Sequence, residues 1–171
     1  EKRIRQLPSS KLNKRGLWQA IQVSRRLENE NITHVLSSAW PRALMTAEIV
    51  AEKLGLTVQQ HDLLHEHIAN PILNGLSLDH ELAIEYREAT KNKNRGVDWK
   101  FKEAGESMGE MINRAKLVKK DIESIYWGKN VLVVSHGFFM SCLLAVFLTG
   151  EDTDDLILRK ISLSITSMEN T

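Results

Sequence analysis

Apolar residues recur at helical spacing in five stretches of the chain. The expected helices cover residues 17–27, 41–54, 78–90, 108–125 and 138–150. Pro41 suits the first turn of the second helix, and Gly55 suits its end. Ser107 and Glu110 form a Ser-x-x-Glu capping box, so the fourth helix should begin at Met108.

Short runs of β-branched and large aliphatic residues lie between these helices and predict four strands. They cover residues 32–38, 56–60, 131–134 and 161–167. The run from Val131 to Val134 has no polar alternation, which is typical of an interior parallel strand covered on both faces. Residues 161–167 alternate, as an edge strand does. Strands that alternate with helices predict an α/β fold, and we expect one domain over residues 1–171.

The beginning of the chain lacks an element that this fold class usually has. An α/β domain commonly opens with a buried strand, whereas residues 1–15 are polar and basic and lead directly into a helix. Either the sheet is small, or a first strand is missing from the sequence.

Composition and charge narrow the possible partners. The chain has 171 residues, of which 42% are hydrophobic and 26% charged, as in ordinary soluble domains. A net charge of +1 gives no reason to expect a nucleic acid or a membrane as partner. The longest apolar run, Cys142 to Leu148, is far shorter than the ~20 residues of a membrane span. The single cysteine excludes an intrachain disulfide and fits a reducing, cytoplasmic location.

Polar residues follow the apolar run of Val131 to Val134, at the point where a ligand site would form. Ser135, His136 and Gly137 stand between this strand and a helix. Open α/β sheets bind ligands beyond the carboxyl ends of their strands, where helix N-termini present free N–H groups. His136 is therefore a candidate catalytic or anion-binding residue, and Gly137 permits close backbone approach. A histidine that merely hydrogen-bonds a neighbour is the alternative.

Arg42 occupies the first turn of a helix, directly after a strand that ends in Ser37 and Ser38. The helix dipole disfavours a cation there, so this position suggests that an anion shares the site. The planar guanidinium can bind two phosphate oxygens together, which lysine cannot do. A solvent-exposed arginine is the alternative.

Glu66 lies between two histidines and is a candidate proton donor. A carboxyl group partly removed from water can protonate a leaving oxygen, although a surface glutamate is the alternative. His61, His65 and His67 with Glu66 suggest a metal site as a second hypothesis. Adjacent residues on a strand point to opposite faces, and position 69 is alanine rather than the second histidine of an HExxH motif. We therefore expect no metal here.

Two ways of cleaving a phosphate ester with a side-chain nucleophile do not fit the sequence. A cysteine nucleophile requires an arginine six positions later, but the residue six after Cys142 is Leu148. Asp152-x-Asp154 follows a helix rather than the hydrophobic strand that an aspartate nucleophile requires. We interpret Cys142 as an inert apolar residue.

Five motifs occur in an order that resembles the histidine phosphatase superfamily, with its phosphoglycerate mutase-like fold. The resemblance runs from about residue 11 to the end of the chain. The motifs are Leu12-Asn13-Lys14-Arg15-Gly16, Ser37-Ser38-x-x-x-Arg42-Ala43-x-x-Thr46-Ala47, Leu64-x-Glu66, Gly105-Glu106-Ser107 and Val133-Val134-Ser135-His136-Gly137.

The resemblance implies a three-layer sandwich with a mostly parallel central sheet flanked by helices. It also implies a phosphomonoesterase that acts through a phosphohistidine intermediate on a small phosphorylated metabolite, without metal or cofactor. Arg42, His136 and Gly137 would bind the phosphoryl group, or inorganic phosphate, and Glu66 would protonate the leaving oxygen. A variable segment of about residues 68–104 would select the substrate.

One part of the family pattern is absent. The Arg-His-Gly motif that carries the nucleophilic histidine does not occur in the 171 residues, and its expected place is at or before Glu1. We therefore expect an N-terminal truncation and an inactive chain without that histidine. Position 39 also departs, with Ala39 where the family commonly has proline. Mutase-type phosphoryl transfer and a non-catalytic phosphate-binding protein are the alternative functions.

Overall fold

The computed structural model describes residues 6–92, 95–150 and 153, and it contains one parallel sheet. The strands are β1 (His34–Ser37), β2 (Val58–Gln60) and β3 (Val131–Val134), in the order β2-β1-β3. Val35 is paired with Val58 on one side and with Leu132 on the other. The three described strands therefore form one continuous parallel sheet.

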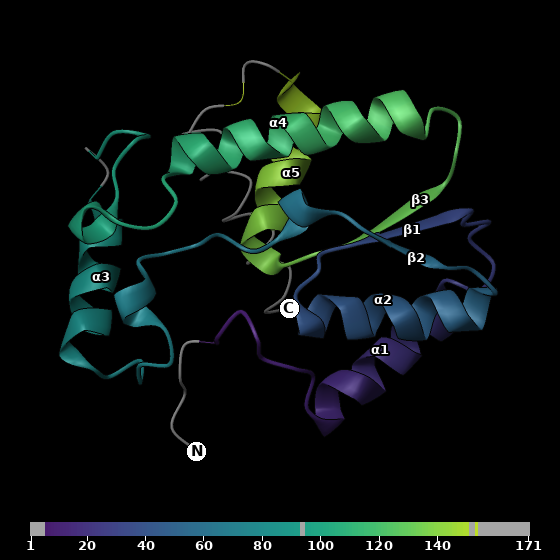
Figure 1. Ribbon diagram of the computed structural model, residues 1–171, viewed down its shortest axis with the longest axis horizontal. Helices are drawn as coiled ribbons and strands as arrows, with labels where there is room; N and C mark the ends of the chain where they lie inside the picture. The colour runs from purple at the N-terminus through teal and green to yellow at the C-terminus, as the bar shows by residue number, and fades with distance from the viewer. Residues whose placement is uncertain (1–5, 93–94, 151–152, 154–171) are drawn as a thin grey trace.

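Helices cover both faces of this sheet (Figure 1). Helices α1 (Lys14–Arg26) and α2 (Pro41–Leu54) lie on one face, and α4 (Met108–Ile125) and α5 (Gly137–Thr149) lie on the other. The three-layer α/β sandwich predicted from the sequence is confirmed. No helix among the described residues is long and apolar enough to cross a membrane.

Strand β1 is the central strand. Its side chains alternate between the two layers: Val35 packs toward α2, whereas Leu36 belongs to the cluster formed with α4 and α5. The prediction that Val131–Val134 is covered on both faces is confirmed: Val131 and Val133 pack against the cluster of α4 and α5, and Leu132 and Val134 against that of α2. Among the described residues, however, the interior strand of the sheet is β1 and not β3. All four of its residues are only half-buried, because β3 pairs with β1 alone among the described residues. The edge strand expected at 161–167 lies outside the described residues.

Local capping signals fix the helix ends as the sequence predicts. Helix α2 has Pro41 in its first turn and ends at Gly55, which adopts the left-handed conformation with φ 67°. The capping box of Ser107 and Glu110 opens α4. Helix α1 begins earlier than expected, because the side chain of Asn13 accepts a hydrogen bond from Gly16 N.

The described residues between 68 and 104, called the cap segment below, form a separate lobe beside the sandwich (Figure 1). The lobe contains α3 (Glu81–Lys91) and the short 3₁₀ turns Pro71–Leu73 and Phe101–Glu103. A further turn, Asp62–Leu64, leads into it from β2. The lobe has its own small apolar cluster around Ala69, Leu73 and Phe101.

Candidate active site

The candidate residues from three distant segments line one hollow at the carboxyl end of β1 and β3. Arg42 lies in the first turn of α2, Glu66 follows the turn Asp62–Leu64, and His136 is the N-cap of α5. The hollow has a volume of about 320 Å³. Its walls are formed by Gln6, Leu12, Arg42, Ala43, Thr46, Glu66, Val134, Ser135, His136 and Gly137. The parallel strand order causes this convergence, because both strands end at the same edge.

His136 is a buried histidine with one polar side-chain partner. Its ring atom Nε2 lies 2.9 Å from Ser38 Oγ, and its ring centroid lies 5.0 Å from that of Trp40. Burial, with the nearby positive charges of Arg42 and other basic residues, lowers the pKa of His136 to about 4. The imidazole is therefore neutral at neutral pH and can hydrogen-bond to an oxyanion.

Arg42 is half-buried and keeps part of its guanidinium available. Its Nη1 donates to the carbonyl of Leu7 at 3.2 Å, and its Cζ lies 4.9 Å from the ring centroid of Trp40. Burial lowers the pKa of Arg42, and the carboxylate of Glu66 opposes that effect. The group nevertheless stays charged, since guanidinium does not deprotonate in proteins.

Glu66 binds the N-terminus of α5. Its Oε1 accepts from the backbone N–H groups of His67 at 2.8 Å and Phe139 at 3.0 Å. Its Oε2 accepts only the longer bond from Phe138 N, at 3.2 Å. Both oxygens are thus held by peptide N–H donors, which favour a carboxylate at this helix end. Oε2 accepts one such bond and Oε1 accepts two.

Trp40 is a site residue that the sequence analysis missed. Its indole ring stacks near His65, at 6.0 Å and 19°, and also contacts His136 and Arg42. The sequence feature that could have identified Trp40 is its position: a large aromatic residue between the serine pair and Arg42, where the chain leaves the strand and enters the helix. Ser38, already part of a motif, contributes the hydroxyl that meets His136.

The three histidines proposed as metal ligands face different partners. His61 Nε2 lies 3.3 Å from Asp121, His65 Nδ1 lies 2.8 Å from Glu66 O, and His67 Nε2 lies 2.8 Å from Glu106 O. Within the described ranges, no group of three or more His, Cys, Asp or Glu side chains is arranged to hold a metal ion. The geometry does not favour a metal site at these positions.

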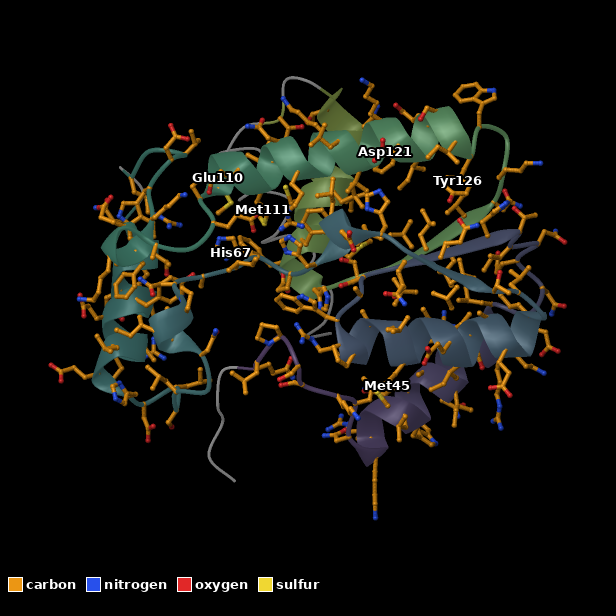
Figure 2. All side chains as sticks on the ribbon, viewed as in Figure 1. Met45, His67, Glu110, Met111, Asp121 and Tyr126 are labelled. Carbon is orange, nitrogen blue, oxygen red and sulfur yellow. The ribbon has the colours of Figure 1, made fainter. Side chains whose placement is uncertain are left out.

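Two further hollows lead from the site toward the cap segment. The nearer one shares Arg42 and Glu66 with the site, and it also has Trp40, His67 and Ala69 in its wall. The farther one, of about 230 Å³, shares His67 and Ala69 with the nearer one. Its aromatic wall comprises Tyr86, Trp99, Phe101 and Phe138. Figure 2 shows His67 at the junction between the lobe and the sandwich.

Comparison with known proteins gives a family and curated relatives. The model of the family described as histidine phosphatase superfamily (branch 1) matches residues 1–171. A protein of Escherichia coli named "Probable phosphoglycerate mutase GpmB" is 32% identical over 148 residues, covering 86% of this chain and 68% of that protein. The protein of the same name from Yersinia pestis is 32% identical over 147 residues, covering 86% and 67%.

Solved structures show the same fold. A mycobacterial glucosyl-3-phosphoglycerate phosphatase in complex with inorganic phosphate superposes with a TM-score of 0.73 at 22% identity, covering 86% of this chain and 74% of that chain. A phosphoserine phosphatase from Entamoeba histolytica gives a TM-score of 0.68 at 21% identity, covering 86% and 71%. At the coarse level, the family supports an activity of the phosphatase type.

Proposed function

Because the chain belongs to the histidine phosphatase superfamily, we propose that it is a phosphomonoesterase that acts through a phosphohistidine intermediate on a small phosphorylated metabolite. One observation carries the proposal: Arg42, Glu66 and His136, far apart in the sequence, line a single hollow at the sheet edge. A cation, a neutral imidazole and a carboxyl group are the groups that phosphate binding and leaving-group protonation need.

In this proposal the phosphoryl group binds between α2 and α5. The guanidinium of Arg42 grips two of its oxygens, and His136 donates a hydrogen bond to a third. Gly137 opens α5, and a Cβ added there would meet no atom within 4 Å, so an anion can approach the backbone closely. A dianion that binds beside His136 raises the pKa of this imidazole, because it favours the protonated form.

The proposed reaction has two steps. A nucleophilic histidine attacks phosphorus, the bond from phosphorus to the leaving oxygen breaks, and Glu66 gives that oxygen a proton. Water then attacks the phosphohistidine, releases inorganic phosphate and restores the histidine, with Glu66 taking up the proton. Positioning and charge neutralisation suffice for such a loose transition state, and no metal or cofactor takes part in the proposed steps.

The nucleophile is not among the residues of the site. The Arg-His-Gly motif of the family does not occur in the 171 residues. We therefore propose that these residues supply phosphate binding and the acid, and that turnover requires a nucleophilic histidine in addition to them.

The cap segment, residues 68–104, is the proposed selector of the leaving group. The hollows that run from the site toward Tyr86 and Trp99 support this assignment, because a leaving group bound to phosphorus has to extend from the site. Mutase-type phosphoryl transfer is a second candidate, favoured by the name of the curated relatives. A substrate panel separates the two: a phosphatase releases inorganic phosphate, whereas a mutase returns an isomer of its substrate.

The test is hydrolysis of p-nitrophenyl phosphate by the purified gene product, by which we mean a chain that carries the nucleophilic histidine in addition to the 171 residues, between pH 5 and 7.5, with and without EDTA. We expect turnover that EDTA leaves unchanged and that His136→Ala lowers by at least about 100-fold. His34→Ala, a matched change outside the hollow, should keep the parent rate. The 171-residue chain without the additional histidine should bind vanadate and show no turnover. Absence of turnover from the gene product under every condition would leave a phosphate-binding protein instead of an enzyme.

A further inference from the structure

A buried ion pair lies against the backbone on both sides of Glu66. The side chain of Arg114, on α4, is 7% exposed, and that of Glu106 is 11% exposed. Arg114 Nε donates to Glu106 Oε1 at 2.7 Å and Nη2 donates to Oε2 at 2.9 Å, so the pair is bidentate. The guanidinium also lies over the ring of Phe139, with 4.1 Å from Cζ to the ring centroid.

The remaining donors of Arg114 hold the backbone just before Glu66. Nη1 donates to the carbonyl of Leu63 at 2.6 Å and to that of His65 at 2.9 Å. In addition, the hydroxyl of Ser135 donates to the carbonyl of Leu64 at 2.5 Å. Three consecutive carbonyls before Glu66 are therefore bound by side chains from α4 and from the end of β3.

Glu106 holds the backbone just after Glu66. Its Oε2 accepts from Ile68 N at 3.2 Å, and its own N–H donates to the carbonyl of Ile68 at 2.5 Å. Its carbonyl lies 2.8 Å from His67 Nε2. The ion pair thus fixes the segment on both sides of Glu66.

Gly105 permits this arrangement. It has φ 91°, and a Cβ added there would lie 2.7 Å from backbone atoms of Ile68, Ala69 and Asn70. Only glycine allows such an approach. The motif Gly105-Glu106-Ser107 therefore combines a close backbone approach, the acid of the ion pair and the N-cap of α4.

We propose that Arg114 and Glu106 are positioning residues that hold the carboxyl group of Glu66 at the N-terminus of α5. The inference rests on the proposed role of Glu66 as the proton donor. A buried ion pair is a poor source of net stability, because desolvation offsets much of the attraction. Nearly every N–H of the Arg114 guanidinium donates to Glu106 or to a backbone carbonyl just before Glu66. This arrangement indicates that the ion pair orients the segment that carries Glu66.

The dependence of the rate on the leaving group separates positioning from a general structural role. An alkoxide leaves slowly unless it is protonated, whereas p-nitrophenolate leaves readily without a proton. A variant that displaces Glu66 should therefore damage hydrolysis of an alkyl phosphate and spare that of p-nitrophenyl phosphate. A variant that merely loosens the fold should lower both rates equally.

The experiment compares kcat/KM of the gene product on ethyl phosphate and on p-nitrophenyl phosphate. We expect Arg114→Lys to lower the ethyl phosphate value by at least about 10-fold and the aryl value by less than about threefold. Glu66→Gln should show the same selectivity, and the double variant should add no further selective loss. Glu123→Gln, which breaks the exposed pair with Lys119 on the same helix, is the control and should change neither value. Equal losses on both substrates with Arg114→Lys, or selectivity confined to Glu66→Gln, would overturn the inference.

A second readout does not need activity. The N–H groups of Phe138 and Phe139 are in the first turn of α5 and bond to Glu66, so their hydrogen exchange reports its position. Exchange at both should accelerate in Arg114→Lys and in Glu106→Gln as it does in Glu66→Gln, and stay at the parent rate in Glu123→Gln. If the gene product hydrolyses neither ester, the proposed function fails, and unchanged exchange in Arg114→Lys rejects the inference separately.

Discussion

The sandwich and the cap segment are built on different amounts of buried surface. In the sandwich, Phe139, Leu143 and Val118 are at most 2% exposed and belong to one continuous cluster. In the cap segment, α3 has no buried residue, and the apolar cluster contains only three buried residues. Glu66 lies where the two parts meet, two residues before the cap segment begins.

This difference suggests a division of labour. The residues around the hollow are held by helix ends and strand ends whose positions depend on a dense core. The cap segment depends on few buried contacts, so its sequence can vary without displacing Arg42 or His136. Under the proposed function, phosphate recognition and leaving-group selection can thus change independently.

The largest expected effect is the loss of a core aromatic residue. Phe139→Ala removes a fully buried ring that also lies under Arg114 and should lower the free energy of unfolding by about 3–5 kcal/mol. Phe101→Ala in the cap segment should cost less, about 1–2 kcal/mol, because its cluster is small. Urea denaturation measures both. Equal losses would mean that the cap segment is as well packed as the sandwich.

A glycine pair tests the contact between the two parts. Gly105→Ala should lower the free energy of unfolding by more than about 2 kcal/mol, because its Cβ would overlap the backbone of Ile68 to Asn70. Gly128→Ala is matched in conformation, with φ 70°, but its Cβ would meet no atom within 4 Å. It should cost only about 1 kcal/mol. Similar costs would show that the two segments can separate.

A smaller effect is expected on ligand affinity. Arg42→Lys keeps the charge and loses the planar fork, so the Kd for inorganic phosphate should rise about 10-fold in calorimetry. Arg25→Lys, on the exposed end of α1, is the control and should leave the Kd unchanged. A Kd that Arg42→Lys does not alter would place Arg42 outside the phosphate site.

The free energy of unfolding should also depend on pH. The pKa of His136 is lowered from 6.5 to about 4 by burial and nearby positive charge, so the unfolded chain takes up this proton first as the pH falls. The free energy of unfolding should therefore decrease as the pH falls from about 6.5 to about 4, and the full contribution of His136 to stability should remain above that range. His136→Gln should flatten this part of the curve in urea denaturation. An unchanged slope in the variant would assign the pH dependence to other groups.

Local signals made most of the sandwich predictable. Pro41 and Gly55 bounded α2, and the capping box at Ser107 opened α4, since each signal acts within a few residues. The coverage of β3 on both faces was also predictable, whereas its pairing was not, because apolar content does not determine pairing. Val131–Val134 is the more hydrophobic run, yet β1 has partners on both sides.

The candidate site was predictable mainly where a residue followed a strand end, as Arg42 and His136 do. Glu66 was a candidate because it lies between two histidines, and the family resemblance gave it the same role. Arg114 gave no such signal, because an arginine on a helix is ordinary until the turn at Gly105 brings Glu106 against it. Trp40 was missed because aromatic residues beside a polar motif usually belong to a core.

The most direct test follows the ring of His136 by NMR while inorganic phosphate is added to the 171-residue chain. If Arg42, Glu66 and His136 surround a phosphoryl site, bound phosphate should raise the pKa of His136 from about 4 by roughly one unit or more, and the largest shifts should cluster on residues of the hollow. A pKa of His136 that phosphate leaves unchanged, with shifts elsewhere on the surface, would contradict the account.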